Sequence, residues 1–402
     1  MAAAVFFTGW DLLEAESLKH ERQVDYKTLS DLVKLSFGVV AGAAALVALV
    51  VAYRRQKVDE DGAQREATRL HTERFTAAVS QLGNEAAAVR LGGVHALAGL
   101  ADDAPTRDLR QTCIDVLCAY LRMPYTAEAD LPSGDADARH TYLALREVRH
   151  TIIRLIRDHL RDRSHPHSWQ GHDLDFTAVV FDGGDFSRAG FVDSTVSFNS
   201  AVFASGTVNF NDTWCCRSTV DFSHTVFAGG TVNFGHASFS RSTVDFGHAR
   251  FSGSTVTFDQ AAFFPVAVGP FEERIHGNGV TFHDAVFSAG TVSFKTARFS
   301  HGTVGFGRAE FCGALVRFNW AEFTGVGSAQ FVHAVFSRGT VTFDHAMFAS
   351  AGTARFDEAE FTGADVVFRD ARGVLPPGLV PWDGQPVPAG LSLPPAWNPP
   401  TS

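Results

Sequence analysis

The chain has 402 residues, enough for more than one domain, and its formal net charge of −10 excludes a strongly basic nucleic-acid-binding protein. Phenylalanine outnumbers tyrosine 36 to 5, which predicts a dry and repetitive interior, because phenylalanine has no polar group to turn toward water. The 5 cysteines are scattered and match neither a disulfide framework nor zinc spacing. They favour reduced thiols and a cytosolic environment.

The first predicted element is a membrane-spanning helix over residues 35–53, which follows an N-terminal segment of mixed charge at 1–34. The stretch "LSFGVVAGAAALVALVVAY" has no charged residue. At a rise of ~1.5 Å per residue it is about as long as the hydrocarbon core of a bilayer is thick. A signal peptide does not fit, because the stretch begins too late and lacks a cationic leader. The alternative is a buried helix of a soluble protein.

The charges that flank this stretch predict its orientation. Arg54, Arg55 and Lys57 follow it directly, whereas Lys34 alone precedes it closely. Because positively charged loops stay on the cytoplasmic side, we expect a single-pass protein of the cell membrane with cytoplasmic C-terminal domains. Over wider windows the asymmetry nearly vanishes, so this expectation depends on the immediate flanks.

A helical segment is predicted over residues 56–165. A polar helix at 56–82 is followed by helices at 84–103, 106–125 and about 138–161, in which apolar residues recur at helical spacing. Short helices joined by short loops favour a small bundle or a pair of HEAT-like repeats.

Over residues 173–372 the helical pattern stops and phenylalanine recurs at fixed steps. The steps are first five residues long and then alternate between seven and five as far as Phe323. The stretch "FPVAVGPFEERIHGNGV" keeps this spacing if Pro270 and Ile275 fill two phenylalanine positions. Self-similarity at a fixed period predicts a solenoid.

The small residue two positions before each phenylalanine indicates short extended segments. Residues two apart on a strand point the same way, so Val244 and Phe246 are expected to point inward together. Glycine, serine, asparagine, aspartate and histidine fill the intervening corners. The predicted structural core includes Phe198, Phe222, Phe246, Phe294 and Phe318.

These motifs resemble the pentapeptide repeat family, whose motif is A-[D/N]-[L/F]-x-x. The matches include "AVVFD", "AGFVD", "ASFSR", "ARFSG", "AEFTG" and "AMFAS", and they extend over roughly half the chain. The resemblance implies a right-handed quadrilateral β-helix, a mainly β solenoid, with about 20 residues per coil. The helical segment upstream resembles the membrane-linked segment that precedes such repeats in actinobacterial proteins.

This chain departs from the family because every second repeat carries two extra residues. Steps of five, seven, five and seven predict about eight coils of about 24 residues each. A flatter coil of about 12 residues is the competing geometry. The proline-rich tail at 373–402 is expected to be extended and disordered.

The sequence contains no recognised catalytic motif or nucleotide-binding fingerprint, so neither an enzyme nor a cofactor is expected. His224 and His248 would lie one coil apart on a corner, where two imidazoles can hold a metal. The same corner position accepts many residue types, which favours an ordinary solvated corner, and no metal is expected.

The leading functional hypothesis is a membrane-tethered scaffold without catalysis, whose β-helix binds an unidentified protein partner; a homo-oligomer remains open. A candidate interaction stripe is predicted from Arg250, Arg274 and Arg298, which would stack on one face and attract an acidic partner or anionic lipid. Screening of these arginines by side chains such as Glu273 is the alternative.

The family resemblance also suggests a DNA mimic that inhibits or protects a topoisomerase. The positive and negative charges of the repeats are too balanced for such a mimic. Nucleic acid is not expected as a partner. An enzyme is the third alternative.

Overall fold

The computed structural model describes residues 26–128, 131–264, 279–300, 303–324, 329–350, 353–380 and 387–398. The chain divides into two compact units, Met1–Arg69 and Leu70–Ser402. The helices are α2 (Tyr26–Leu82), α3 (Ala87–Asp102), α4 (Arg107–Arg122), α5 (Ala136–Leu160) and the 3-10 helix η3 (Pro395–Trp397).

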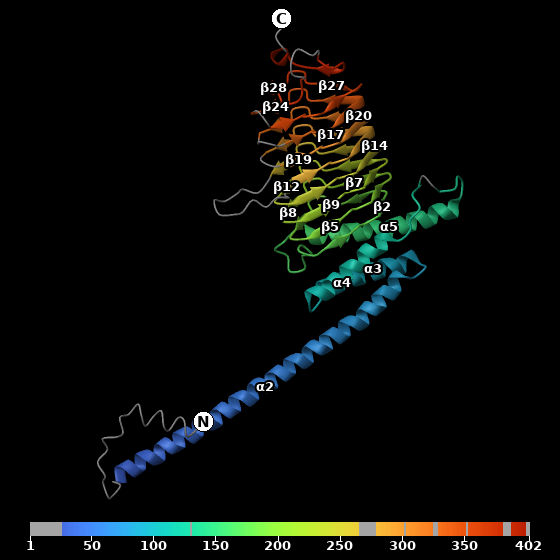
Figure 1. Cartoon of the computed structure of the whole chain (residues 1–402). Helices are drawn as coiled ribbons and strands as arrows, with labels where there is room; N and C mark the ends of the chain where they lie inside the picture. Colours follow the sequence, from blue (N-terminus) through green and yellow to red (C-terminus); the bar gives the residue numbers. More distant parts are fainter. Residues whose placement is uncertain are drawn as a thin grey trace, which may run out of the picture. The chain divides into compact units, whose positions relative to one another are not determined.

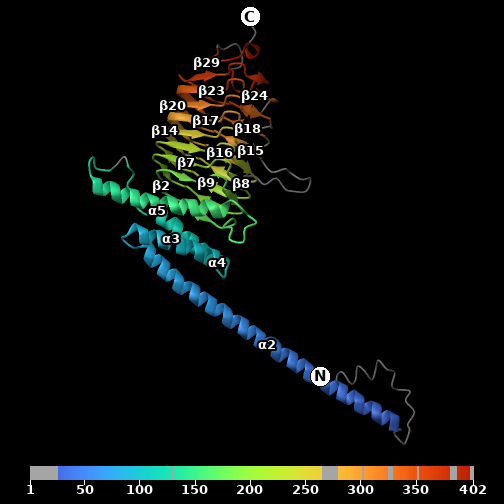
Figure 2. The same cartoon turned by 180° about the vertical axis from the view of Figure 1, so that it is seen from behind.

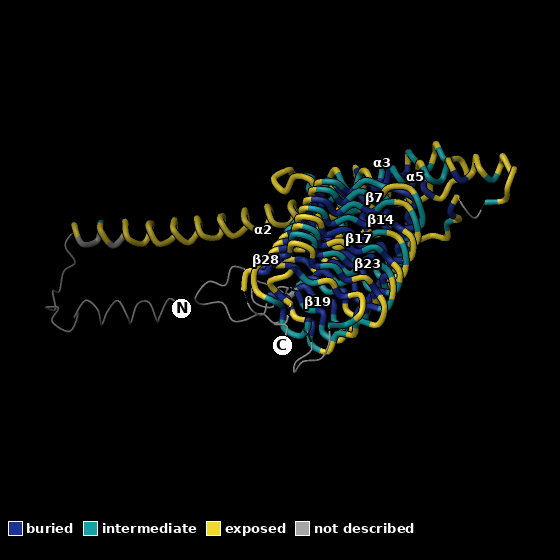
Figure 3. Tube along the Cα trace, turned by 90° about the horizontal axis from the view of Figure 1, so that it is seen from above, coloured by how far each residue is buried: buried dark blue, intermediate teal, exposed yellow. Residues whose placement is uncertain are grey.

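Helix α2 joins the predicted membrane segment and the predicted polar helix into one element of 57 residues. In the apolar stretch 35–53 the large side chains are exposed, from 50% at Val50 to 73% at Phe37, and Figure 3 shows the trace of this part of the helix as exposed. No residue of its most apolar 18-residue window is buried by the rest of the described chain. The helix is long and apolar enough to cross a membrane, and the described chain does not bury its most apolar part.

Two of the next three helices begin at side-chain caps. The Thr106 side chain accepts a hydrogen bond from the amide of Leu109 at the start of α4, and the Asp135 side chain accepts one from Ala138 at the start of α5. Helix α3 begins three residues later than predicted, because the Asn84 side chain binds the amide of Ala86 in a turn before it.

The β-structure consists of short parallel strands in three sheets of eight, thirteen and eight strands. The first sheet contains β1 (Leu174–Asp175), β5 (Thr195–Ser197), β9 (Thr219–Asp221), β13 (Thr243–Asp245), β16 (Gly279–Thr281), β19 (Thr303–Gly305), β22 (Ala329–Gln330) and β25 (Ala354–Arg355). The second contains β2 (Val180–Phe181), β3 (Gly184–Asp185), β6 (Val202–Phe203), β7 (Thr207–Asn209), β10 (Val226–Phe227), β11 (Thr231–Asn233), β14 (Arg250–Thr257), β17 (Val286–Ser293), β20 (Glu310–Arg317), β23 (Val335–Thr342), β26 (Glu360–Phe361), β27 (Asp365–Val367) and β29 (Leu391–Ser392). The third contains β4 (Gly190–Val192), β8 (Trp214–Cys216), β12 (Ser238–Ser240), β15 (Ala262–Phe264), β18 (Arg298–Phe299), β21 (Glu322–Phe323), β24 (Met347–Phe348) and β28 (Arg372–Gly373).

The pairing of these strands confirms a β-solenoid of about eight turns with about 24 residues in each turn. Val226 pairs with Val202 on one side and with Arg250 on the other, which is a step of 24 residues in both directions. The competing coil of half this length is therefore wrong. Figure 1 and Figure 2 show the coils rising in sequence order from α5, with the strands of each sheet in line.

The interior consists of stacked phenylalanine rings. The rings of Phe198 and Phe222 are parallel to within 2° with centroids 4.5 Å apart, and Phe246 follows at 4.7 Å. Rings of the neighbouring column meet them edge to face. All five predicted core phenylalanines are no more than 2% exposed. Full burial of one such side chain contributes about 1.5–3 kcal/mol, so the repeated columns form the main stabilising core.

The tight corners explain the polar residues of the repeat. In one of them the amide of Ala201 donates to the carbonyl of Phe198 at 3.0 Å, and Ser200 between them has a φ of +57°. Aspartate, asparagine and histidine tolerate this left-handed conformation better than most residues, which accounts for the histidines two positions after phenylalanine. The residue before phenylalanine also stabilises the corner, since Asp245 Oδ1 accepts a hydrogen bond from the amide of Gly247 at 2.7 Å.

The alignment of coils changes between Phe264 and Gly279. Val244 pairs with Val280, and Phe246 stacks on Phe282, so the step here is 36 residues, twelve more than one coil. The phenylalanine spacing does not reveal this change. One step of seven and one of five add up to twelve residues, so an insertion of twelve leaves the phenylalanine pattern unchanged. The predicted continuation of the coil through Pro270 and Ile275 lies outside the described residues, and the pairing on either side of it does not follow that prediction.

The tail corrects a second prediction, because its described residues are ordered against the last coil. Strand β29 pairs with β27, and the buried Trp397 lies 5.6 Å from the ring of Phe348 and 5.8 Å from that of Phe368. The Trp397 indole donates to the carbonyl of Gly373. The last coil of a solenoid exposes its core unless something covers it, and the tail supplies that cover.

The helical segment closes the opposite end. Helix α4 packs on β1, α5 packs on β3, and Ile153 and Ile156 of α5 belong to the same buried cluster as the first phenylalanines. Helices α3 to α5 and the β-helix therefore share one continuous hydrophobic core. From α3 onward, the segment predicted at 56–165 is thus a cap on the β-helix.

Candidate interaction surfaces

The predicted arginine stripe is not formed. Arg250 lies on β14 of the second sheet between Val226 and Val286, whereas Arg298 lies on β18 of the third sheet. Arg274 lies outside the described residues. The prediction was wrong because the twelve extra residues before Gly279 move every later residue half a coil around the β-helix.

Arg298 also has a counter-charge on its own face. It pairs in register with Glu322, whose carboxylate lies 3.6 Å from the guanidinium Nε. Both side chains are more than half exposed, and such an exposed pair contributes little stability. The observed arrangement is therefore local screening and not a run of like charges.

One corner of the β-helix carries a line of charged and imidazole side chains, which we call the corner ladder. It consists of His224, His248, Asp284, Arg308, His333 and Glu358. Arg308 binds Asp284 through both carboxylate oxygens, at 2.9 and 3.1 Å, and His333 lies 3.1 Å from Glu358. The hydrogen bond from Arg308, together with nearby charges, lowers the pKa of Asp284.

Two histidines of the corner ladder, His224 and His248, lie one coil apart, as the sequence predicts. The rings of His224 and His248 stack at 4.9 Å and are parallel to within 4°. Within the described residues, no group of three or more metal-ligating side chains comes together. The positive φ of both residues, +58° and +57°, is sufficient reason for histidine at these corners.

The second tight corner carries an unusual residue, Trp320. Its φ is +60° and its side chain is 53% exposed, although the equivalent position one coil earlier is Thr296 and one coil later is His345. A bulky residue in the left-handed region is uncommon, and an exposed tryptophan gains little from the fold. Its ring stacks on His345 at 4.2 Å, which holds it against the surface.

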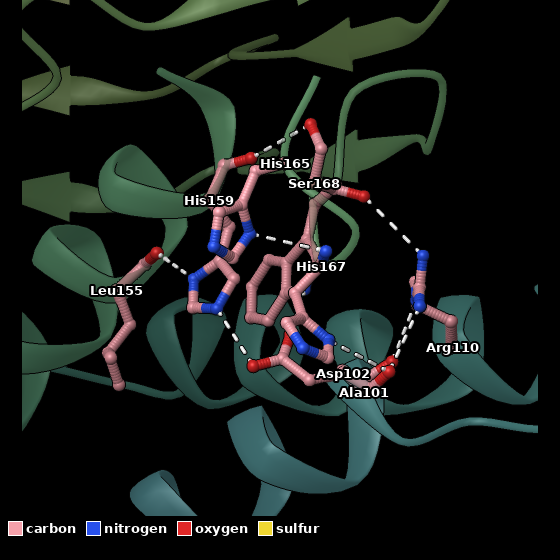
Figure 4. A network of polar contacts seen from close by, with 9 residues as sticks. Ala101, Asp102, Arg110, Leu155, His159, His165, His167 and Ser168 are labelled. Carbon is pink, nitrogen blue, oxygen red and sulfur yellow. Dashed lines mark hydrogen bonds and ion pairs between the residues drawn. The ribbon is translucent and has the colours of Figure 1, made fainter. Parts of the chain in front are cut away.

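Figure 4 shows a polar network in which Asp102, at the end of α3, meets His159 of α5. The His159 Nε2 atom lies 3.1 Å from Asp102 Oδ2, its Nδ1 lies 2.6 Å from the carbonyl of Leu155, and Trp169 donates to Asp102 Oδ1. The Ser168 hydroxyl donates to the His159 backbone carbonyl and not to the imidazole. This aspartate and histidine therefore join the helices and do not belong to a Ser-His-Asp triad.

A second network joins α5 to the first coil around Asp182, whose side chain is 3% exposed. Tyr125 and Tyr142 donate to one carboxylate oxygen at 2.6 and 2.7 Å, and His150 lies 3.2 Å from the other. Burial raises the pKa of Asp182, but these hydrogen bonds outweigh it and hold the pKa well below its usual range. Arg149 donates to backbone carbonyls of α4 and β2 and lies over the Tyr125 ring.

An apolar groove of about 510 Å³ lies between the end of α2 and helices α3 to α5. Val79, Leu82, Val116 and Leu145 form much of its wall, and Arg149 reaches its edge. All of these residues belong to the second compact unit. The groove offers mainly apolar contact, and Glu85 and Arg90 are also among its lining residues.

The cysteines remain free thiols in the described chain. Burial raises the pKa of Cys215 to about 12 and that of Cys113 to about 11. Thiols held protonated in this way are poor nucleophiles, so Cys215 is a packing residue in a phenylalanine column.

The sequence predictions did not find Asp182, Asp102 or Trp320. Both aspartates acquire their partners only when the helices pack on one another and on the first coil, and no spacing in the sequence indicates these contacts. The signal for Trp320 was present, since tryptophan stands at a corner position that histidine, aspartate and threonine otherwise fill.

Comparisons of the chain with family models, with curated proteins and with solved structures returned no match. The resemblance to pentapeptide repeat proteins therefore depends on the motifs themselves and on the β-solenoid that they form.

Proposed function

We propose that this protein is a single-pass membrane protein whose capped β-helix serves as a non-catalytic scaffold for a protein partner, on the cytoplasmic side of the cell membrane. The observation that carries the proposal is the exposed apolar stretch at 35–53 in α2. An uncovered apolar surface of this length is unfavourable in water, and a bilayer covers it completely. Arg54 and Arg55 supply the cytoplasmic flank.

The scaffold role is supported by what the β-helix offers. Its interior is filled with phenylalanine rings, so it has no room for a substrate, and the polar networks of the described residues link elements of the fold. Its outer faces repeat at the spacing of the coils and are rigid. A rigid surface binds a partner with little loss of conformational entropy.

Trp320 is the residue that we assign to partner contact. Exposed tryptophans often dominate the binding energy of protein interfaces, and stacking on His345 still leaves Trp320 53% exposed at a left-handed corner. Replacing Trp320 with histidine introduces the residue type that the next coil has at the equivalent corner position, namely His345. The variant should fold normally and lose partner binding.

Two measurements test the proposal. Alkaline carbonate extraction of native membranes should leave the full-length protein in the pellet, whereas release into the supernatant would contradict the tether. Chemical crosslinking in native membranes should then give a discrete adduct that Trp320→His removes. Gln260→His, at the same corner two coils away, is the matched control and should keep the adduct. An adduct that both variants keep would contradict the role of Trp320.

A further inference from the structure

A cleft of about 520 Å³ lies between α5 and the first coils of the β-helix, away from the surfaces assigned above. Four basic or imidazole side chains of α5 line it, namely Arg146, His150, Arg154 and Arg157. Their spacing of four, four and three residues places them on successive turns of one helix face. A single face of α5 thus presents three arginines and one histidine to a recess.

Part of the opposite wall is bare backbone, at Gly183 and Gly184. Gly183 and Gly184 have φ angles of +130° and +146°, which only glycine adopts readily. A Cβ at Gly184 would lie 3.0 Å from Ile153 Cδ1, and one at Gly183 would lie 3.2 Å from His150 Cε1. These two glycines let the β-helix approach α5 closely, while the cleft beside the arginines stays open.

Within the described residues, carboxylates face Arg146 and Arg157 but not Arg154. Asp182 already receives two tyrosine hydroxyls and His150. The Arg146 Nε atom lies 3.2 Å from Asp182 but makes no hydrogen bond to it and has no other partner, although it is buried. Arg157 is paired with both Asp185 and Asp158.

Arg154 is the least satisfied member of the row. Its guanidinium donates to the hydroxyl of Thr151 at 3.1 Å, and it faces no carboxylate among the residues that the structure describes. An arginine has five N–H donors, so most of the hydrogen-bonding capacity of Arg154 is unused within the protein. The cleft therefore has both spare positive charge and spare donors.

We propose that this cleft binds a small ligand that carries a phosphate group. Guanidinium groups match phosphate oxygens in charge and in fork geometry, and Arg146 and Arg154 have donors to spare on one helix face. Thr207 and Asn209 of β7 add neutral hydrogen-bonding groups on the other wall. The recess has the volume of a small-molecule site, and this favours a small ligand over a nucleic acid.

The phosphate group has two chemical sources, a soluble phosphate compound or the phosphodiester head group of a lipid. Full-length protein in nanodiscs of phosphatidylcholine is titrated in a calorimeter with inorganic pyrophosphate in one arm and with glycerophosphoglycerol in the other. Binding of pyrophosphate alone identifies a soluble compound with a terminal phosphate. Stronger binding of glycerophosphoglycerol identifies a lipid head group.

Arg154→Ala should weaken binding of the preferred probe by about tenfold or more, because a hydrogen bond to a charged group is lost. Arg139→Ala is the matched control, since Arg139 lies on α5 but pairs with Glu128 outside the cleft. Thermal unfolding of both variants should match that of the wild type, because Arg154 has no ion pair within the described chain. The proposal is overturned if neither probe binds, or if Arg154→Ala binds as tightly as Arg139→Ala.

Discussion

Replacement of Phe246 by alanine tests the packing of the β-helix most sharply. The Phe246 ring is fully buried and lies between Phe222 and Phe282, with centroid distances of 4.7 Å on both sides. Phe234 and Phe258 meet its edge at 6.0 and 5.6 Å. Rings held by backbone ladders on each side cannot collapse into the cavity, so we expect the free energy of unfolding to fall by about 3–5 kcal/mol.

The loss should be local as well as large. Each coil contacts only its neighbours, so amide exchange should accelerate most in β9 and β16, the strands that pair with β13 beside Phe246. Phe246→Leu retains most of the side-chain volume and should cost less than about 1.5 kcal/mol. The assays are urea unfolding of detergent-solubilised protein by circular dichroism and hydrogen exchange by mass spectrometry. Equal effects of alanine and leucine, or a change spread evenly over all coils, would refute this packing.

Three further predictions concern the corners, the junction and the tail. His248→Ile should lower the free energy of unfolding by about 1–3 kcal/mol, because a β-branched residue is strained at φ +57°. His248→Gly should match the wild type in urea unfolding. Equal stability of the two variants would contradict this prediction. Asp182 has a lowered pKa, so its stabilisation is present above its unfolded pKa of about 4 and is lost as the pH falls toward the folded value. The stability gap between the wild type and Asp182→Asn should therefore narrow from pH ~5 to pH ~2 in urea titrations, and a constant gap would count against the network. Trp397→Ala should speed amide exchange in β27 while leaving β5 unchanged, and protection that stays the same in β27 would show that the tail is not a cap.

Much of the β-helix was predictable because its signals are local and repeated. The pair Val244 and Phe246 indicates an inward-facing strand, and the steps of five and seven gave the coil length that the pairing of Val226 with Arg250 confirms. The aspartate or asparagine before phenylalanine, as at Asp245, carried a further signal for the corner turn that the sequence interpretation did not use.

The alignment across the coils was not predictable in the same way. A period of twelve residues cannot distinguish one half-coil from the next, so the pattern assigns Arg250 and Arg298 to one face although they lie in different sheets. Only hydrogen bonding between coils resolves this ambiguity. The prediction of a disordered tail was wrong because a high proline content indicates only that a segment cannot form its own core. Trp397 is instead held by packing on the open end of the last coil.

The candidate surfaces were harder to predict than the fold for a related reason. Asp182 and Arg154 acquire their roles from contacts between a helix and a coil that are distant in sequence. Such contacts follow from how the capping helices dock on the β-helix, and the composition of neither element indicates them.

The alignment of the coils decides which side chains share a face, and paired cysteines measure it directly. In full-length protein with Cys216 and Cys312 changed to serine, Val286→Cys is combined either with Arg250→Cys or with Ala262→Cys, the partner that an uninterrupted step of 24 residues would give to Val286. Residues paired on neighbouring parallel strands lie about 4.8 Å apart, within the reach of a disulfide. The observed pairing of Arg250 with Val286 predicts rapid oxidation of the first combination and slow oxidation of the second. Rapid crosslinking of positions 262 and 286, with none between 250 and 286, would contradict the alignment and restore the arginine stripe.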